Sequence, residues 1–120
     1  MNYRNMPAGQ ELDRLVVEEV MGWSKYIEEC DNGWILSGPM YLGKWSPSTD
    51  ISQAWRVIDK ITGIAEDYMF PVIELSDKVY AGLIHYREQI ILDELIVADS
   101  APLAICRGAL IAKLNKENQP

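Results

Sequence analysis

The sequence predicts an α+β domain in which a three-stranded antiparallel sheet lies between helices, an α-β-α sandwich. The hydrophobic period is helical over 50–63, becomes extended over 69–98 and returns to helical over 100–114. The extended segments carry apolar residues on both faces, whereas a sheet with one bare face shows polar residues at alternate positions. We therefore expect helices on both faces, in the order helix, irregular hairpin segment, helix, three strands, helix.

The last predicted helix, 100–114, is apolar almost all the way round. Between Ala101 and Leu114 only Arg107 and Lys113 are charged. A helix with so little polar surface must be covered on more than one side. Its small residues recur at helical spacing and predict the close approach of another backbone: Ala104, Gly108 and Ala112.

Arg107 falls in the middle of the leucine face of this helix. In one interpretation its aliphatic stem lies on apolar surface while the guanidinium reaches water or a carboxylate. In the other, Arg107 is a site or interface residue with a fixed acidic partner. The sequence leaves both interpretations open.

Two further helices are predicted from apolar spacing. The first covers 11–20, stops at Gly22 and buries Leu12, Leu15, Val16 and Val20. The second opens at 48–50, where Asp50 and Gln53 resemble a capping box, and ends at 62–63. Its predicted buried stripe consists of Ile51, Ala54, Trp55, Ile58 and Ile61.

The segment 24–47 has no sustained period and contains several turn signals. Its short apolar pieces, 33–36 and 40–42, are candidates for a small hairpin. Aromatic residues crowd this segment, either as a ligand wall or interface anchor or as lids that close the core. The candidate ligand-binding or partner-binding residues are Trp34, Tyr41, Trp45 and Arg107.

Three strands are expected at 69–75, 79–86 and 90–98, within a single domain that spans 1–120. Pro71 limits the first strand to an edge or to a later start. The polar ends, 1–10 and 115–120, are expected to be loose.

Composition excludes several classes of protein. The net charge of −7 argues against binding to a phosphate backbone, which needs a basic face. No apolar run reaches membrane-spanning length. The sequence shows no secretion signal, so we expect Cys30 and Cys106 to be reduced thiols in a cytoplasmic protein.

The search for catalytic chemistry finds few candidates. The one histidine, His85, lies on a predicted strand, and no pattern places a nucleophile beside it. No cysteine or histidine cluster has zinc spacing, and no glycine-rich phosphate loop is present. We therefore expect no cofactor and no metal.

Three stretches, 11–23, 48–58 and 98–110, resemble the phage ABA sandwich domain family of bacteriophages and prophages. The third, Ala98-Asp-Ser-Ala-Pro-Leu-Ala-Ile-Cys-Arg-Gly-Ala-Leu110, is the most specific. The resemblance implies an α-β-α sandwich and a phage origin, hence a bacterial host cell. It implies no established activity.

Three functional hypotheses follow. The first is a non-enzymatic phage accessory protein that binds a host or phage protein, or itself. As a symmetric dimer it would use the apolar patch of the last helix or the aromatic loop, with Arg107 paired to a carboxylate at the interface. The second is a small-ligand binder in which the 34–45 loop and Arg107 form an anion pocket. The third is a hydrolase built on carboxylates and His85.

Overall fold

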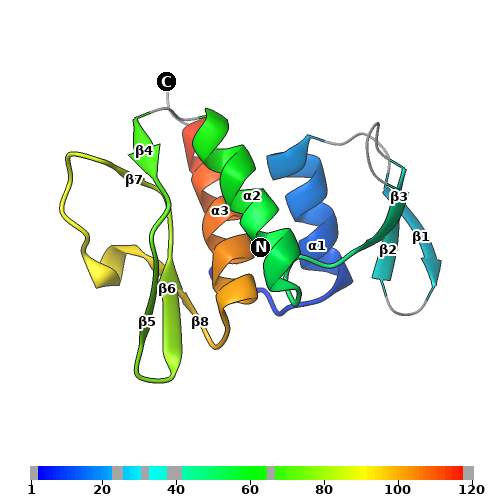
Figure 1. Cartoon of the computed structure of the whole chain (residues 1–120), viewed down its shortest axis with the longest axis horizontal. Helices are drawn as coiled ribbons and strands as arrows, with labels where there is room; N and C mark the ends of the chain where they lie inside the picture. Colours follow the sequence, from blue (N-terminus) through cyan, green and yellow to red (C-terminus); the bar gives the residue numbers. More distant parts are fainter. Residues whose placement is uncertain (1–2, 23–25, 31–32, 38–41, 65–66, 118–120) are drawn as a thin grey trace.

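Three helices lie side by side in the middle of the molecule, with strands at either end (Figure 1). The structure is a computed structural model that describes residues 3–22, 26–30, 33–37, 42–64 and 67–117. The helices are α1 (Gln10–Leu15), α2 (Ile51–Ile64) and α3 (Ala101–Glu117). A π-helical segment, η2 (Val16–Met21), continues α1, and two 3-10 turns flank the fold, η1 (Tyr3–Asn5) and η3 (Leu92–Glu94).

The strands form antiparallel sheets. One sheet has the order β1-β2-β3, a second β5-β6-β8, and β4 pairs with β7 in a short ribbon. In chain order the strands are β1 (Tyr26–Cys30), β2 (Gly33–Ser37), β3 (Leu42–Trp45), β4 (Tyr68–Met69), β5 (Val72–Leu75), β6 (Lys78–Ala81), β7 (Ile84–His85) and β8 (Ile96–Ala98).

The predicted α+β class and its three-stranded antiparallel sheet are confirmed by β5-β6-β8 and the helices beside it. Helix α3 packs on one face of this sheet, and α2 and η2 pack in turn on α3 (Figure 1). Residues of β6 and β8 that alternate toward α3 are buried: Val79, Ala81, Ile96 and Ala98. Among the described residues, the helices all lie on this side of the sheet.

The three predicted strands are shorter than expected and interrupted. The first breaks at Phe70 and Pro71, because proline lacks the N–H that a ladder needs. The second breaks at Gly82 and Leu83, which separate β6 from β7. The third begins only at Ile96, after the 3-10 turn η3.

The predicted hairpin is confirmed where the structure describes it. Strands β2 and β3 pair in antiparallel register, with Trp34 opposite Trp45. The sequence did not predict the third member, β1, which pairs with the other edge of β2. The predicted residues Met40 and Tyr41 lie outside the described residues.

Local signals at the helix ends are also confirmed. Gly22 ends η2 with φ 72°, a left-handed conformation that glycine adopts without strain. Asp50 Oδ1 accepts a 3.1 Å hydrogen bond from the Gln53 N–H at the start of α2. Gln53 Oε1 also accepts the Ser46 N–H at 2.6 Å.

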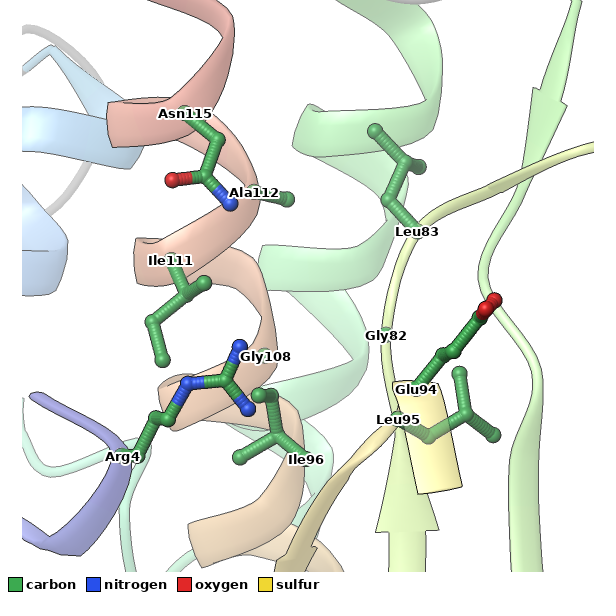
Figure 2. Close-up of a pocket in the computed structure, with 10 residues that line it drawn as sticks. All are labelled: Arg4, Gly82, Leu83, Glu94, Leu95, Ile96, Gly108, Ile111, Ala112 and Asn115. Atoms are coloured by element: carbon green, nitrogen blue, oxygen red, sulfur yellow. The ribbon is translucent and has the colours of Figure 1, made fainter. Parts of the chain in front are cut away.

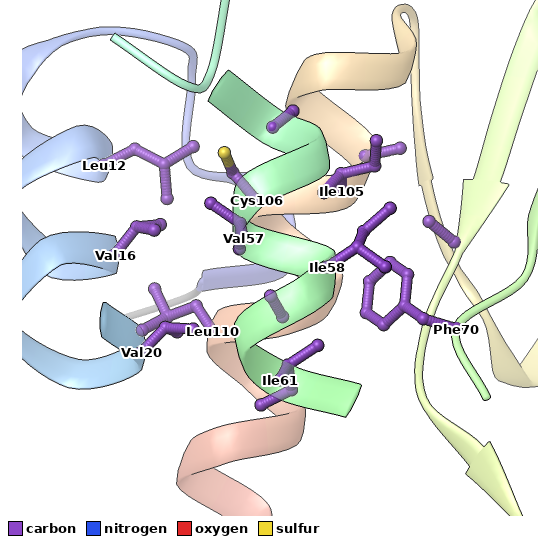
Figure 3. Close-up of a cluster of buried hydrophobic side chains, with 14 of the residues drawn as sticks. Leu12, Val16, Val20, Val57, Ile58, Ile61, Phe70, Ile105, Cys106 and Leu110 are labelled. Carbon is purple, nitrogen blue, oxygen red and sulfur yellow. The ribbon is translucent and has the colours of Figure 1, made fainter. Parts of the chain in front are cut away.

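Helix α3 is covered from several directions, as its apolar composition predicts. It contacts α1, η1, η2, α2 and the β5-β6-β8 sheet. Ile105, Cys106 and Leu110 are fully buried in the cluster that joins these elements (Figure 3). Cys106 forms no disulfide, while the side chain of Cys30 lies outside the described residues.

The predicted face of α2 is wrong at two positions. The buried residues are Ala54, Val57, Ile58 and Ile61, whereas Ile51 is 42% exposed and Trp55 50% exposed. At 100° per residue, Trp55 lies about 110° from the centre of the buried stripe. Val57, which the predicted stripe did not include, is buried in the core cluster instead (Figure 3).

The chain ends are more structured than expected. Met6 is buried and Tyr3 packs against the core, so the described part of 1–10 is docked rather than loose. Helix α3 continues through Asn115 to Glu117, into the segment predicted to be a tail. No helix in the described ranges is long and apolar enough to span a membrane.

Candidate functional site

The predicted aromatic site lies partly in the core. Trp45 is fully buried, and a ring without exposed surface has none to offer a ligand. This burial supports the interpretation of Trp45 as a lid on the core. Trp34 lies opposite it on β2, but the side chain of Trp34 and all of Tyr41 lie outside the described residues.

Arg107 bridges two segments of backbone. Its Nε donates to the Met6 carbonyl oxygen at 2.7 Å, and its NH1 donates to the Val97 carbonyl oxygen at 3.2 Å. Arg107 thus ties the N-terminal segment to strand β8. Burial lowers the pKa of Arg107, and the nearby Asp99 carboxylate partly opposes this shift. In one of the two interpretations of the sequence Arg107 has a fixed acidic partner, but these two hydrogen bonds go to main-chain carbonyls.

A buried polar joint connects α1 with the loop before α2. The Ser48 N–H donates to Asp13 Oδ1 at 2.8 Å, and Ser48 Oγ accepts the Gly9 N–H at 3.0 Å. Both Asp13 and Ser48 are almost fully buried. Burial raises the pKa of Asp13 to about 6, although its hydrogen bonds with Ser48 oppose the shift. Desolvation and the Asp13 charge together raise the pKa of the buried Cys106 thiol.

A cavity of about 100 Å³ lies between α3 and the segments that follow β6 and precede β8 (Figure 2). Its floor includes three residues with no side chain larger than a methyl group: Gly82, Gly108 and Ala112. It is also lined by the aliphatic side chains of Leu83, Leu95, Ile96 and Ile111 and by the polar side chains of Arg4, Glu94 and Asn115.

The small-residue stripe of α3 brings this helix close to the sheet. A Cβ atom at Gly108 would lie 3.0 Å from the Ala81 carbonyl oxygen and 3.1 Å from Phe70 Cζ. The close backbone approach predicted from the stripe is therefore confirmed. The sequence signalled this contact but not the cavity beside it, because the cavity also needs Gly82 and Arg4, which lie far away in sequence.

The face of sheet β5-β6-β8 that points away from α3 is partly exposed. Ile73, Tyr80 and Val97 stand opposite one another in a row across its three strands, and Val97 is 43% exposed. We call this row, together with its neighbours Leu75, Lys78 and Asp99, the free face. Lys78 Nζ forms an ion pair with the Asp99 carboxylate at its end.

His85 belongs to a surface ring cluster on the β4-β7 ribbon. Its ring lies 4.9 Å from the Tyr86 ring in a stacked arrangement and 5.3 Å from Tyr68 in an edge arrangement. His85 Nδ1 accepts the Arg87 N–H at 3.2 Å, and Arg87 also lies over the Tyr86 ring. Within the described residues, no group of three or more histidine, cysteine, aspartate or glutamate side chains is arranged to hold a metal ion.

The chain was compared with family models, curated proteins and solved structures. The family model of the phage ABA sandwich domain matches residues 14–110. No curated protein and no solved structure matches the chain. The match begins at the end of α1 and ends within α3, and it therefore covers α2, the sheets and most of the cavity lining. The chain belongs to the phage ABA sandwich domain family.

Proposed function

We propose that this protein is a phage or prophage accessory protein that acts by protein binding rather than catalysis, through self-association at the free face. The observation that carries the proposal is the apolar row Ile73, Tyr80 and Val97. On an antiparallel sheet a solvated face normally shows polar residues at these positions. An apolar face of this kind is stabilised when a second surface covers it.

Other exposed apolar residues gather in the same part of the chain. Seven of the nine large hydrophobic side chains that are exposed among the described residues come from the segment between α2 and α3. They are Tyr68, Met69, Leu75, Tyr86, Ile90, Ile91 and Val97. The helices contribute only Ile51 and Trp55 to this set of described residues. The surface on the sheet side therefore has more apolar area to offer to a partner.

The charges of the free face favour a second copy of this chain as the occupant. With a net charge of −7, two copies repel each other when their acidic surfaces meet. On the free face the only charged members, Lys78 and Asp99, form an ion pair and balance each other. Two copies can thus approach at this face without bringing unpaired like charges together.

The strand edge is a poorer docking element than the face. Strand β5 is four residues long, follows Pro71 and carries the exposed Glu74. Short length, proline and charge are features that discourage the addition of another strand. We accordingly assign the contact to the side chains of the free face. The proposed location is the cytoplasm of a bacterial host.

Sedimentation velocity across micromolar concentrations tests self-association. We expect wild type to form a dimer and Val97→Glu to be monomeric, because two glutamates would be buried unpaired at the symmetric contact. Ile51→Glu is the matched control. Ile51 is exposed to the same degree as Val97 and begins α2, where a carboxylate suits the helix N-terminus.

The control also tests the location of the contact. We expect Ile51→Glu to remain dimeric like wild type. A monomer at every wild-type concentration contradicts self-association. A dimer that survives Val97→Glu but is lost in Ile51→Glu contradicts the free face and moves the contact to α2.

A further inference from the structure

The negative charge of this chain is distributed unevenly along the sequence. The segment 65–100, between α2 and α3, contains eight carboxylate side chains and two lysine or arginine side chains, a net charge of −6. The rest of the chain contains ten carboxylates and nine lysines or arginines, a net charge of −1. The summed field of a protein steers partners of opposite sign toward its charged regions. This segment is therefore the part of the chain that attracts a basic partner.

One end of the molecule combines exposed carboxylates with exposed apolar side chains. We call this region, residues 67–69 and 84–94, the acidic end. Figure 1 shows β4, β7 and the chain that leads to η3 at the opposite end of the molecule from β1. Its carboxylates are all exposed: Asp67, Glu88, Asp93 and Glu94. Its exposed large hydrophobic side chains are Tyr68, Met69, Tyr86, Ile90 and Ile91.

The single lysine or arginine of the acidic end is engaged within it. Arg87 Nε donates to the Tyr86 hydroxyl oxygen at 3.0 Å, and the guanidinium carbon lies 5.4 Å from the centre of the Tyr86 ring. Within the parts of the chain that the structure describes, none of the four carboxylates of the acidic end forms an ion pair. These carboxylates are thus available to the cations of a partner.

Backbone and ring contacts hold the aromatic part of this surface in place. The Tyr86 N–H donates to the Asp67 carbonyl oxygen at 3.0 Å, and the Glu88 N–H donates to the His85 carbonyl oxygen at 2.9 Å. The His85 ring stacks on the Tyr86 ring and meets the Tyr68 ring edge-on. Tyrosine side chains held in this way offer apolar contact area at a low cost in conformational entropy.

We propose that the acidic end binds a basic amphipathic segment of a partner protein, whose cations face the carboxylates and whose apolar side chains cover the tyrosines and isoleucines. The apolar contacts supply buried area, while the opposite charges orient the partner and speed the encounter. A second copy of this chain is a poor occupant, because its own acidic end would bring carboxylates against carboxylates. The acidic end shares no residue with the free face, so this proposal does not depend on self-association.

Protein-detected NMR on the full chain labelled with ¹⁵N tests the proposal. The probe is a helical peptide of leucine, lysine and alanine, with its leucines on one face and its lysines on the other. We expect saturable shifts at the amides of residues 84–94, with a Kd of about 10–100 µM at low salt. Two control peptides, with serine in place of each leucine or glutamate in place of each lysine, should each bind at least about tenfold more weakly.

Variants of exposed residues test the apolar contribution. Ile90→Ser combined with Ile91→Ser should weaken binding of the probe at least about tenfold. Ile51→Ser is the matched control, because Ile51 is exposed to a similar degree but lies on α2. We expect this control to bind the probe like wild type.

A second pair of variants tests the charge contribution. Glu88→Gln combined with Asp93→Asn should weaken binding about tenfold and reduce its dependence on salt, because exposed charges are screened by salt. The control, Glu18→Gln combined with Asp59→Asn, removes the same two types of carboxylate from exposed positions on the helices. It should change the affinity by less than about threefold.

Four results would overturn the proposal. They are the absence of saturable shifts with the probe, shifts that map to the helices instead of residues 84–94, equal binding of the lysine–serine peptide, and unchanged binding in the isoleucine variant. Because every substituted residue is exposed, the variants should fold like wild type, and the amide spectrum of each one checks this directly.

Discussion

Helices α3 and α2 show how differently apolar residues can be used in neighbouring elements. Helix α3 has apolar residues around most of its circumference and is covered by helices on one side and a sheet on the other. Helix α2 has a single buried stripe and exposes both Ile51 and Trp55. The high apolar content around α3 therefore predicted its burial correctly. The aromatic side chain of Trp55, at the margin of the α2 stripe, did not predict which side of α2 is buried. The predictions below test this difference.

The largest effect should come from truncating α3 in its centre. Ile105 is fully buried, so Ile105→Ala should lower the free energy of unfolding by about 2–5 kcal/mol. Ile51→Ala makes the same change on the exposed margin of α2 and should stay within about 0.5 kcal/mol of wild type. Urea unfolding measures both. If both variants lost the same free energy of unfolding, then Ile105 and Ile51 would not differ in burial as described.

The second effect concerns the buried carboxyl of Asp13, which lies close enough to α3 for its charge to raise the pKa of Cys106. Because burial raises the folded-state pKa of Asp13 from 3.8 to about 6, the folded protein retains a proton that the unfolded chain releases between these values. Stability should therefore fall as pH rises from about 4 to about 6, by up to about 3 kcal/mol from this group.

Asp13→Asn isolates this contribution. Asparagine keeps an oxygen for the Ser48 N–H but carries no charge, so the variant should gain stability relative to wild type as pH rises through the same window. Urea unfolding at pH 4 and pH 7 measures the change. Parallel stability profiles for the variant and wild type would mean that Asp13 ionises normally.

The third effect tests the close contact between α3 and β6. Gly108→Ala raises helix propensity by up to about 1 kcal/mol, but its new methyl group would press on the Ala81 carbonyl. We expect a net loss of about 1–2 kcal/mol. Gly63→Ala on α2 is the matched control and should be stabilising, because a methyl group there would meet no other described segment within 4 Å. Thermal unfolding of the two variants should move in opposite directions.

The smallest effect should come from the largest side chain of α2. A buried tryptophan typically costs about 3–5 kcal/mol when truncated, but Trp55 is half exposed. We therefore expect Trp55→Ala to reduce the free energy of unfolding by less than about 1 kcal/mol. A loss of more than about 3 kcal/mol would mean that Trp55 is buried in the core.

The sequence predicted the elements better than it predicted the site. Helical spacing located all three helices, and the turn residue Gly22 and the cap residue Asp50 took the roles expected from their chemistry. These signals are local, since they depend on residues within one turn of each other. Trp45 and Arg107, in contrast, were assigned by residue type, and their neighbours come from distant parts of the chain.

The sequence by itself determined the α+β class, the helices and the antiparallel pairing, because periodicity and turn chemistry act over a few residues. The family was indicated separately, by the resemblance of three stretches to the phage ABA sandwich domain family. Only the tertiary structure decided which side of α2 is buried, that Arg107 holds Met6 against Val97, and that Gly82 and Arg4 meet beside α3. Each of these features depends on segments that lie tens of residues apart in the sequence. How closely those segments pack depends on small residues such as Gly108, which lets α3 approach the sheet.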